Sequence, residues 1–294
     1  WHKSLDKPRV TGEGIIDADL NVLPSRGSVM KRIEQAGLTS NQAGYLWMDD
    51  SLGLILNKLD ELKLAHNTIV LFVADHGSGH KGSLYKAKGT EVPCIMRWPA
   101  GMKAGVRSEE LIQNTDFVPT WFELAGVKKP AAYRMDGVSL APLFQAPHEP
   151  VREYVYGEIG AARSIKTKTH SYIALRYTRE QVAGVQERQR RELKSLTGLS
   201  GGVSRSIATH PHAYTGDQLY DLNRDPDAQK NLADQKRHAG TLTQMKQKLA
   251  AELKRFPARP YGEFVPGGNA LAGGGYDKVF ETLRQAAVDK KPKK

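Results

Sequence analysis

The sequence of 294 residues contains a single cysteine, Cys94. A single cysteine excludes an internal disulfide and a cysteine-rich zinc site. It lies in the apolar run VPCIM, so we expect a small, buried hydrophobic side chain there. Long hydrophobic runs are also missing. No stretch approaches the roughly 18 apolar residues of a membrane helix, so we predict no membrane span.

The sequence also lacks an initial methionine and a signal segment, because it begins at Trp1. We expect a processed product or a piece of a longer protein. Hydrophobic residues make up 39% and charged residues 26% of the chain, which is typical of soluble globular proteins. The length allows one large α/β domain, or such a domain with a smaller appendage.

Acidic residues are fewer than basic residues, and the formal net charge is +11. Such a surplus attracts anions, whether a substrate, a polymer or a surface. The excess is spread along the chain, with clusters at 188–191 and 290–294. No helix-turn-helix, zinc-finger or RNA-stacking signature accompanies it, so we predict no nucleic-acid partner.

The first half of the sequence alternates helical and strand patterns after an irregular start over residues 1–40. A stripe with a period of 3.6 residues predicts a helix; its members are Met48, Leu52, Ile55, Leu56, Leu59 and Leu62. Residues 69–74 form an apolar, β-branched run that predicts a central strand covered on both faces. Residues 92–98 predict a second strand. Residues 115–126 predict a helix with Asp116 as N-cap and Gly126 as its end.

From about residue 150 the pattern changes to short alternating segments. EYVYGEI, SYIALRY and DQLYDLNRDP predict strands of an antiparallel sheet, and residues 235–255 carry a helical stripe. The charged stretch 179–195 is predicted to be a helix or an exposed insertion. We therefore predict an α/β domain over 1–150, a smaller C-terminal subdomain over 151–260, and a loosely ordered basic tail over 261–294.

The candidate functional residues lie just after the apolar run of residues 69–74. Ligand sites in open α/β sheets lie at the carboxyl ends of strands, and this run exits into Asp75, His76 and Gly77. The first two side chains offer an oxygen and an imidazole nitrogen to a divalent cation. Lys81 can bind an anionic group, and His80 can assist it or protonate a leaving oxygen. Asp, His and Gly are also ordinary turn residues after a strand, so the Asp-His-Gly step taken alone is a weak signal, and a simple turn explains it better than a metal site does.

Six segments in order resemble the sulfatase family, and with the helical stripe that precedes them they extend over about 190 residues. NTIVLFVADHG is followed by HKGSLY and VPCIMRWP, which are similar to the family's metal step, lysine loop and next strand. Farther on, NTDFVPTWFELAG, MDGVSLAPLF and LYDLNRDPDAQKNLAD are similar to three further family segments. The order and spacing identify the chain as a member of this family.

The resemblance implies an alkaline-phosphatase-like α/β sheet flanked by helices, partial here, followed by the smaller α+β subdomain with its antiparallel sheet. It implies a sulfuric ester hydrolase in which Asp75 and His76 bind a divalent cation, usually Ca²⁺. Lys81 would bind the sulfate and stabilise the bridging oxygen, while His80 lies where family members vary. Asp116, the Asp136–Gly137 turn and residues 220–225 would be structural.

The sequence departs from the family pattern in what it lacks. Members carry an upstream Asp-Asp pair and a C/S-x-P-S-R motif whose first residue becomes formylglycine, the nucleophile. The only partial match is VLPSR, where Val22 has no heteroatom to oxidise. We therefore expect a C-terminal portion of a sulfatase that is inactive and poorly stable in isolation. Lys86 and Glu91 replace the usual glutamate and arginine, which weakens any inference about the particular substrate.

Two alternatives remain at this point: a phosphonate or phosphate ester hydrolase of the same superfamily, and an inactive protein that binds sulfated glycans. The expected partner is a sulfated small molecule or glycan. The sequence does not determine the oligomeric state. By analogy with the family, the location is periplasmic, secreted or lysosomal.

Overall fold

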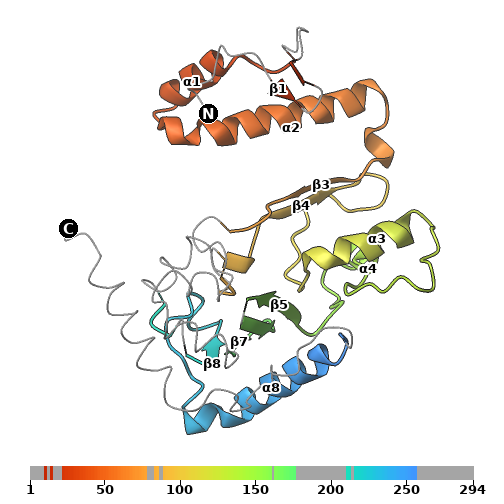
Figure 1. Cartoon of the computed structure of the whole chain (residues 1–294). Helices are drawn as coiled ribbons and strands as arrows, with labels where there is room; N and C mark the ends of the chain where they lie inside the picture. Colours follow the sequence, from red (N-terminus) through yellow and green to blue (C-terminus); the bar gives the residue numbers. More distant parts are fainter. Residues whose placement is uncertain are drawn as a thin grey trace. The chain divides into compact units, whose positions relative to one another are not determined.

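The computed structural model describes most of the chain as two compact units (Figure 1). The first comprises Trp1–Val70 and Met96–Ala104, and the second comprises Leu71–Ile95 and Gly105–Lys294. The described residues are 10–11, 14–15, 22–77, 83–85, 89–160, 162–176, 210–212 and 215–256. In this part of the chain, no helix is long and apolar enough to cross a membrane.

The first unit is built around two helices, α1 (Arg26–Gln35) and α2 (Ala43–Glu61), with a short antiparallel pair β1 (Val10–Thr11) and β2 (Gly14–Ile15). The 3₁₀ turns η2 (Ser40–Gln42) and η3 (Ala65–Asn67) flank α2. Helix α1 falls in the stretch predicted to be irregular, so that prediction was wrong. Ser25 is its N-cap, since the side chain accepts a hydrogen bond from Ser28 N over 3.1 Å. The serine was a usable helix signal.

Helix α2 confirms the helix predicted from the stripe at 48–62, but the stripe is only half covered. Val29, Ile33 and Ala43 form a small buried cluster between α1 and α2. On α2 itself, Ala43 is the only buried residue. Met48 and Ile55 of the stripe remain 44% and 54% exposed. The apolar face that this periodicity predicts is therefore only partly covered within the first unit.

Strands β3 (Val70–Val73) and β4 (Cys94–Arg97) pair in a two-stranded sheet. They lie inside the two runs predicted as strands, but the expectation of a strand covered on both faces was wrong for the described residues. Val73 is 39% and Ile95 64% exposed. Cys94, predicted to be buried, is exposed, because a sheet of only two strands leaves much of its faces open.

The second unit continues with short helices, which follow the 3₁₀ turn η5 (Asn114–Asp116). They are α3 (Phe117–Leu124) and α4 (Ala141–Gln145). The predicted helix at 115–126 is confirmed, and Gly126 follows α3 with a φ of +65°. That left-handed conformation favours glycine at a helix end.

Strands β5 (Val155–Ile159), β6 (Ala162–Lys166), β7 (His170–Leu175) and β8 (Asp217–Asp221) form an antiparallel sheet in that order. The 3₁₀ turn η6 (Lys236–His238) leads into α8 (Ala239–Leu253), which packs on the sheet (Figure 1). Their shared core contains Ile165, Tyr172 and Leu219 from the sheet with Met245 and Leu249 from α8. The predicted antiparallel sheet and late helix are confirmed.

The predicted domain boundaries at residues 150 and 260 stay predictions. The stretch 179–195 and the tail 261–294 lie outside the described residues.

Candidate functional site

Strand β3 ends where the sequence predicts a metal-binding step. Asp75 and His76 follow its last residues, and Gly77 is buried directly after them. The Asp75 side chain is 86% exposed and that of His76 is 36% exposed. Both side chains are therefore open to an ion or to further ligands.

The His76 imidazole lies beside the Asp75 carboxylate, with 3.4 Å between His76 Nε2 and Asp75 Oδ2. On its other side, His76 Nδ1 is 3.0 Å from the carbonyl oxygen of Gly77. A carbonyl oxygen only accepts hydrogen bonds, so Nδ1 carries the proton in this contact. In the neutral ring the lone pair is then on Nε2, the atom that faces the carboxylate. His76 Nε2 and Asp75 Oδ2 are close enough to be linked by a proton on Nε2 or by a bound cation.

The donor pair fits part of a divalent-cation site. A histidine whose second nitrogen donates to a backbone carbonyl is the usual arrangement at protein metal centres, because that bond fixes the ring and its tautomer. Calcium takes about six to eight oxygen ligands, so Asp75 and His76 supply only a fraction of a complete sphere. Within the described ranges, no group of three or more His, Cys, Asp or Glu side chains is placed to hold a metal.

The other two predicted site residues, His80 and Lys81, belong to residues 78–82, which the structure leaves undescribed. The chain on either side is fixed by backbone hydrogen bonds. Gly77 N donates to Gly89 O over 3.1 Å, and Thr90 N donates to Tyr85 O over 3.0 Å. The structure thus brings Asp75 and His76 together, and the roles of His80 and Lys81 stay predictions.

The loop after β3 also contains buried residues that were not predicted as site residues. Leu84 and Tyr85 are buried, at 7% and 5% exposed. The Tyr85 hydroxyl donates to Gln218 Oε1 of β8 over 3.0 Å, a contact between residues 133 positions apart. Sequence reasoning assigned the tyrosine only to the GSLY segment. A contact between residues so far apart in the sequence produces no periodic pattern that sequence analysis could detect.

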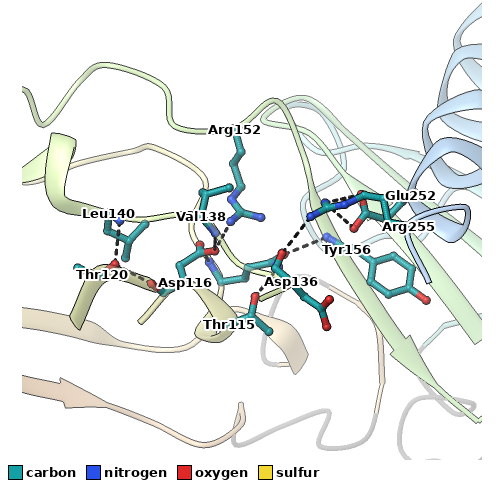
Figure 2. A network of polar contacts seen from close by, with 11 residues as sticks. Thr115, Asp116, Thr120, Asp136, Val138, Leu140, Arg152, Tyr156, Glu252 and Arg255 are labelled. Atoms are coloured by element: carbon teal, nitrogen blue, oxygen red, sulfur yellow. Dashed lines mark hydrogen bonds and ion pairs between the residues drawn. The ribbon is translucent and has the colours of Figure 1, made fainter. Parts of the chain in front are cut away.

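A second polar centre surrounds Asp116 (Figure 2). Its side chain is fully buried and forms an ion pair with Arg152. Its carboxylate also accepts hydrogen bonds from the backbone nitrogens of Gln113, over 2.8 Å, and Val138, over 3.0 Å. Asp116 occupies the predicted N-cap position of α3 but makes no side-chain cap hydrogen bond to that helix. Its carboxylate instead takes part in a capping box of η5 with Gln113, and it also joins the segments of Val138 and Arg152.

Electrostatics at this centre are governed by burial. Burial raises the pKa of the Asp116 carboxyl, against the lowering effect of its backbone donors and of Arg152. Burial likewise lowers the pKa of the Arg152 guanidinium, against the raising effect of Asp116 and Glu252. The pair is therefore costly to bury, and its directional hydrogen bonds fix how the segments meet.

Gly137, in the predicted Asp136–Gly137 turn, shows how closely these segments meet. A Cβ added at Gly137 would lie 2.0 Å from the carbonyl oxygen of Thr115. Any side chain would push the turn away from η5 and with it the Val138 nitrogen that Asp116 binds. The motif is structural, as the resemblance implied.

Comparison with solved structures establishes the class of fold. A protein solved in complex with its substrate D-glucosamine-2-N,6-O-disulfate has a TM-score of 0.55 and 22% identity, covering 74% of this chain and 40% of that chain. The phosphonate monoester hydrolase of Agrobacterium radiobacter has a TM-score of 0.50 and 20% identity, covering 69% of this chain and 38% of that one. The fold is a partial α/β fold of the alkaline-phosphatase-like class.

Sequence comparison then shows which known proteins the chain is similar to. The sulfatase family model matches residues 23–127, a range that includes all four predicted site residues. An ulvan-active sulfatase from Formosa agariphila is 35% identical over 189 residues, which is 60% of this chain and 35% of the relative. The chain is thus similar to sulfatases in sequence, and residues 23–127 match the sulfatase family model. It spans about a third of the length of this curated relative.

Proposed function

We propose that this chain carries part of the active site of a sulfatase, in which Asp75 and His76 hold a divalent cation and Lys81 binds the sulfate group. One observation carries the proposal. The Asp75 carboxylate and the His76 Nε2 stand 3.4 Å apart at the end of β3, inside the region that matches the sulfatase family model.

The chemistry of a sulfate ester explains why such residues would be needed. The ester resists attack because its oxygens carry negative charge. A bound cation, calcium by the family resemblance, would neutralise part of that charge. The Lys81 ammonium would bind a sulfate oxygen and offset the charge that develops on the bridging oxygen as the ester breaks. His80 would donate a hydrogen bond or a proton to the leaving oxygen.

The substrate class proposed is a sulfated glycan or a related small sulfate ester. The Formosa agariphila relative is named an ulvan-active sulfatase, and a protein with a similar fold was solved with a disulfated glucosamine. The net charge of +11 would favour approach of a polyanionic chain.

We expect the chain by itself to hydrolyse little substrate, because its sequence contains no C/S-x-P-S-R motif and hence no residue for conversion to formylglycine. Binding is therefore the more informative first measurement. We would titrate the chain with Ca²⁺ and with inorganic sulfate by calorimetry. Asp75→Ala should abolish the calcium signal, and Lys81→Ala should weaken sulfate binding about tenfold, as loss of a charged hydrogen bond implies.

Matched controls come from exposed residues of the second unit. Asp227→Ala and Lys128→Ala remove the same charges elsewhere and should leave both titrations unchanged. Equal losses in the control variants would mean that the effect is general charge attraction, and the proposed site would be wrong.

Catalysis is tested by hydrolysis of 4-nitrophenyl sulfate with excess calcium. The chain would be assayed alone and in a longer form whose N-terminal extension carries a C/S-x-P-S-R motif. Activity only in the longer form supports a sulfatase whose nucleophile lies in the added region. Activity in the short form would contradict the nucleophile argument, since another residue would then attack the ester.

A second candidate is a phosphonate or phosphate ester hydrolase, because the fold is shared with the phosphonate monoester hydrolase of Agrobacterium radiobacter. The same assay with 4-nitrophenyl phenylphosphonate and 4-nitrophenyl phosphate separates the two. A higher kcat/KM for either phosphorus ester would favour this candidate. Binding of sulfated glycan by a longer form that is inactive on every ester would instead indicate a non-catalytic binding protein.

A further inference from the structure

The Asp75–His76 step is held on both sides by residues 89–93, which we call the backing segment. One backbone hydrogen bond joins the two segments on each side of the step: Ala74 N donates to Pro93 O over 3.2 Å, and Gly77 N donates to Gly89 O over 3.1 Å. The first bond precedes the step and the second follows it. Because one short segment accepts both bonds, its position determines where the two ends of the step lie.

The backing segment is tied to the antiparallel sheet by a buried lysine. Lys166 of β6 is 6% exposed, and its ammonium donates to Thr90 Oγ1 over 2.6 Å. Thr90 Oγ1 in turn donates to Tyr85 O over 3.2 Å, and Thr90 N donates to the same oxygen over 3.0 Å. The hydroxyl proton is thus directed to Tyr85, which leaves an oxygen lone pair for the ammonium.

Lys166 belongs to the face of the sheet that α8 does not cover. It lies opposite Ser171, which lies opposite Tyr220, and these three residues are 6%, 2% and 0% exposed. The loop after β3 contacts this face, since the Tyr85 hydroxyl donates to Gln218 Oε1 over 3.0 Å. A buried ammonium has lost its hydration and depends on protein acceptors, so its contact with Thr90 is a constraint on the backing segment.

The constraint extends to the ring of His76. The His76 Nδ1 atom is 3.0 Å from Gly77 O, so the orientation of the imidazole depends on where Gly77 lies. Gly77 is buried and bound to Gly89, the residue that precedes Thr90. The contacts therefore run without a gap from Lys166 through Thr90 and its neighbour to the histidine.

We propose that Lys166 is a positioning residue: through Thr90 it fixes the backing segment and thereby the orientation of the His76 imidazole. The placement of the ring is a property of the chain alone. The consequence for cation affinity rests on the cation site of the proposed function. The proposal also gives the C-terminal antiparallel sheet a role at the candidate site, through a residue that is not itself a metal ligand.

The placement is tested by the tautomer of His76 in a matched pair of variants. Lys166→Met removes the ammonium and keeps an apolar chain that can stay buried. Lys168→Met removes the same charge from a side chain that pairs with Glu110 instead. Side-chain ¹H–¹⁵N spectra, recorded at about pH 8.5, well above the ordinary pKa of histidine, measure the ratio of Nδ1-protonated to Nε2-protonated rings. His76→Gln assigns the signal.

The ratio should fall about threefold in Lys166→Met, because the Gly77 carbonyl no longer holds the Nδ1 proton in a fixed geometry. It should stay unchanged in Lys168→Met. No change in Lys166→Met, or an equal change in both variants, would overturn the positioning role.

The route through the hydroxyl is tested at Thr90. Thr90→Val removes the acceptor and should change the tautomer ratio as Lys166→Met does, whereas Thr90→Ser keeps the hydroxyl and should preserve the ratio. The double variant Lys166→Met/Thr90→Val should change it no more than the larger single variant does. Additive changes, or a loss in Thr90→Ser as large as in Thr90→Val, would show that Lys166 does not act through this contact.

The consequence is tested by calorimetry with Ca²⁺, where the sign of the effect is informative. By charge alone, removing a nearby ammonium would strengthen cation binding. Loss of positioning would weaken it, and we expect Lys166→Met to bind calcium about fivefold more weakly and Lys168→Met to bind it unchanged. Unchanged or tighter binding in Lys166→Met would mean that Lys166 does not position the cation site.

The two proposals fail in different ways. If Asp75→Ala binds calcium as tightly as the unaltered chain, the proposed cation site is wrong, while the tautomer ratios still support or overturn the placement of His76 by Lys166. If Asp75→Ala abolishes calcium binding but Lys166→Met changes neither the ratio nor the affinity, the proposed cation site stands and the positioning role is wrong.

Discussion

In the proposed cation site, the imidazole of His76 would bring a metal preference that the Asp75 carboxylate does not. Imidazole nitrogen suits zinc, copper and nickel, whereas calcium takes oxygen ligands. We expect His76→Asn, which offers an amide oxygen, to raise the affinity for calcium relative to zinc about tenfold. Competition calorimetry with the two cations measures the ratio. His66→Asn, at an exposed histidine of η3, is the matched control. An unchanged ratio in His76→Asn would remove His76 from the coordination sphere.

Also at the residue scale, the buried Asp116 carboxylate should contribute far more to stability than an exposed carboxylate such as that of Asp227. Asp116→Ala leaves the Arg152 guanidinium, whose side chain is 11% exposed, buried without its carboxylate. Removing one partner of a buried ion pair costs about 3–5 kcal/mol. Urea unfolding should show that loss, while Asp227→Ala, at an exposed carboxylate, should change the free energy of unfolding by about 0.5 kcal/mol or less. Similar losses in both variants would contradict the network as drawn in Figure 2.

At the scale of elements, Asp217 joins the sheet to α8. It accepts hydrogen bonds from Arg176 at the end of β7 and from Lys246 of α8, each over 2.6 Å, and from the Tyr172 hydroxyl over 2.8 Å. Burial by itself raises the pKa of the Asp217 carboxyl. The hydrogen bonds from Lys246 and Arg176 outweigh burial, so the pKa lies below its ordinary value of 3.8.

The sign of the resulting pH dependence follows from linkage. A carboxyl with a lowered pKa in the folded state stabilises the fold above its unfolded pKa and loses that contribution as pH falls through the folded pKa. We expect the free energy of unfolding to drop below about pH 4 and Asp217→Asn to flatten part of that drop. Urea unfolding from pH 2.5 to 7 measures it, with Asp227→Asn as the exposed control. A drop of the same size in Asp217→Asn would show that other carboxyls cause it.

Comparison of individual elements shows what the sequence could predict. Alternation in EYVYGEI and SYIALRY predicted β5 and β7, and a helical stripe predicted α8, because each pattern matches the face that these elements bury. Strand β6 was missed because its segment, ARSIK, buries Ser164 and Lys166. From sequence alone, Lys166 is expected at the surface, because the partner that it has in the buried position, Thr90, lies 76 positions away.

The same limit applies to the candidate site. Asp75 and His76 were predictable because they are adjacent and follow an apolar strand, so their proximity is a local property. Tyr85, Gln218 and His210 come together only through packing of distant segments. Asp116 was correctly predicted as the N-cap residue before α3, but its contacts with Val138 and Arg152 were not predicted, because those residues are distant in sequence.

At the scale of the whole molecule, the net charge of +11 separates general attraction from specific recognition of sulfate. Exposed charges act over a Debye length of about 10 Å at 0.1 M salt, so a highly sulfated polymer interacts with many lysines and arginines at once. We expect affinity for dextran sulfate to fall at least about tenfold between 50 and 200 mM NaCl, as for other polyanions. Affinity for a monosulfated monosaccharide should fall about threefold or less over the same range, because it engages few charges.

Two variants connect this salt dependence to the site. Replacing Arg188, Arg190 and Arg191 by glutamine lowers the net charge by three and should weaken binding of the polymer far more than of the small ester, since a small ester engages few charges. Lys81→Ala should instead weaken the monosaccharide, with a factor that salt hardly changes. If the arginine variant weakens both ligands alike, the small ester is held by general charge, and the sulfate-binding role proposed for Lys81 is wrong.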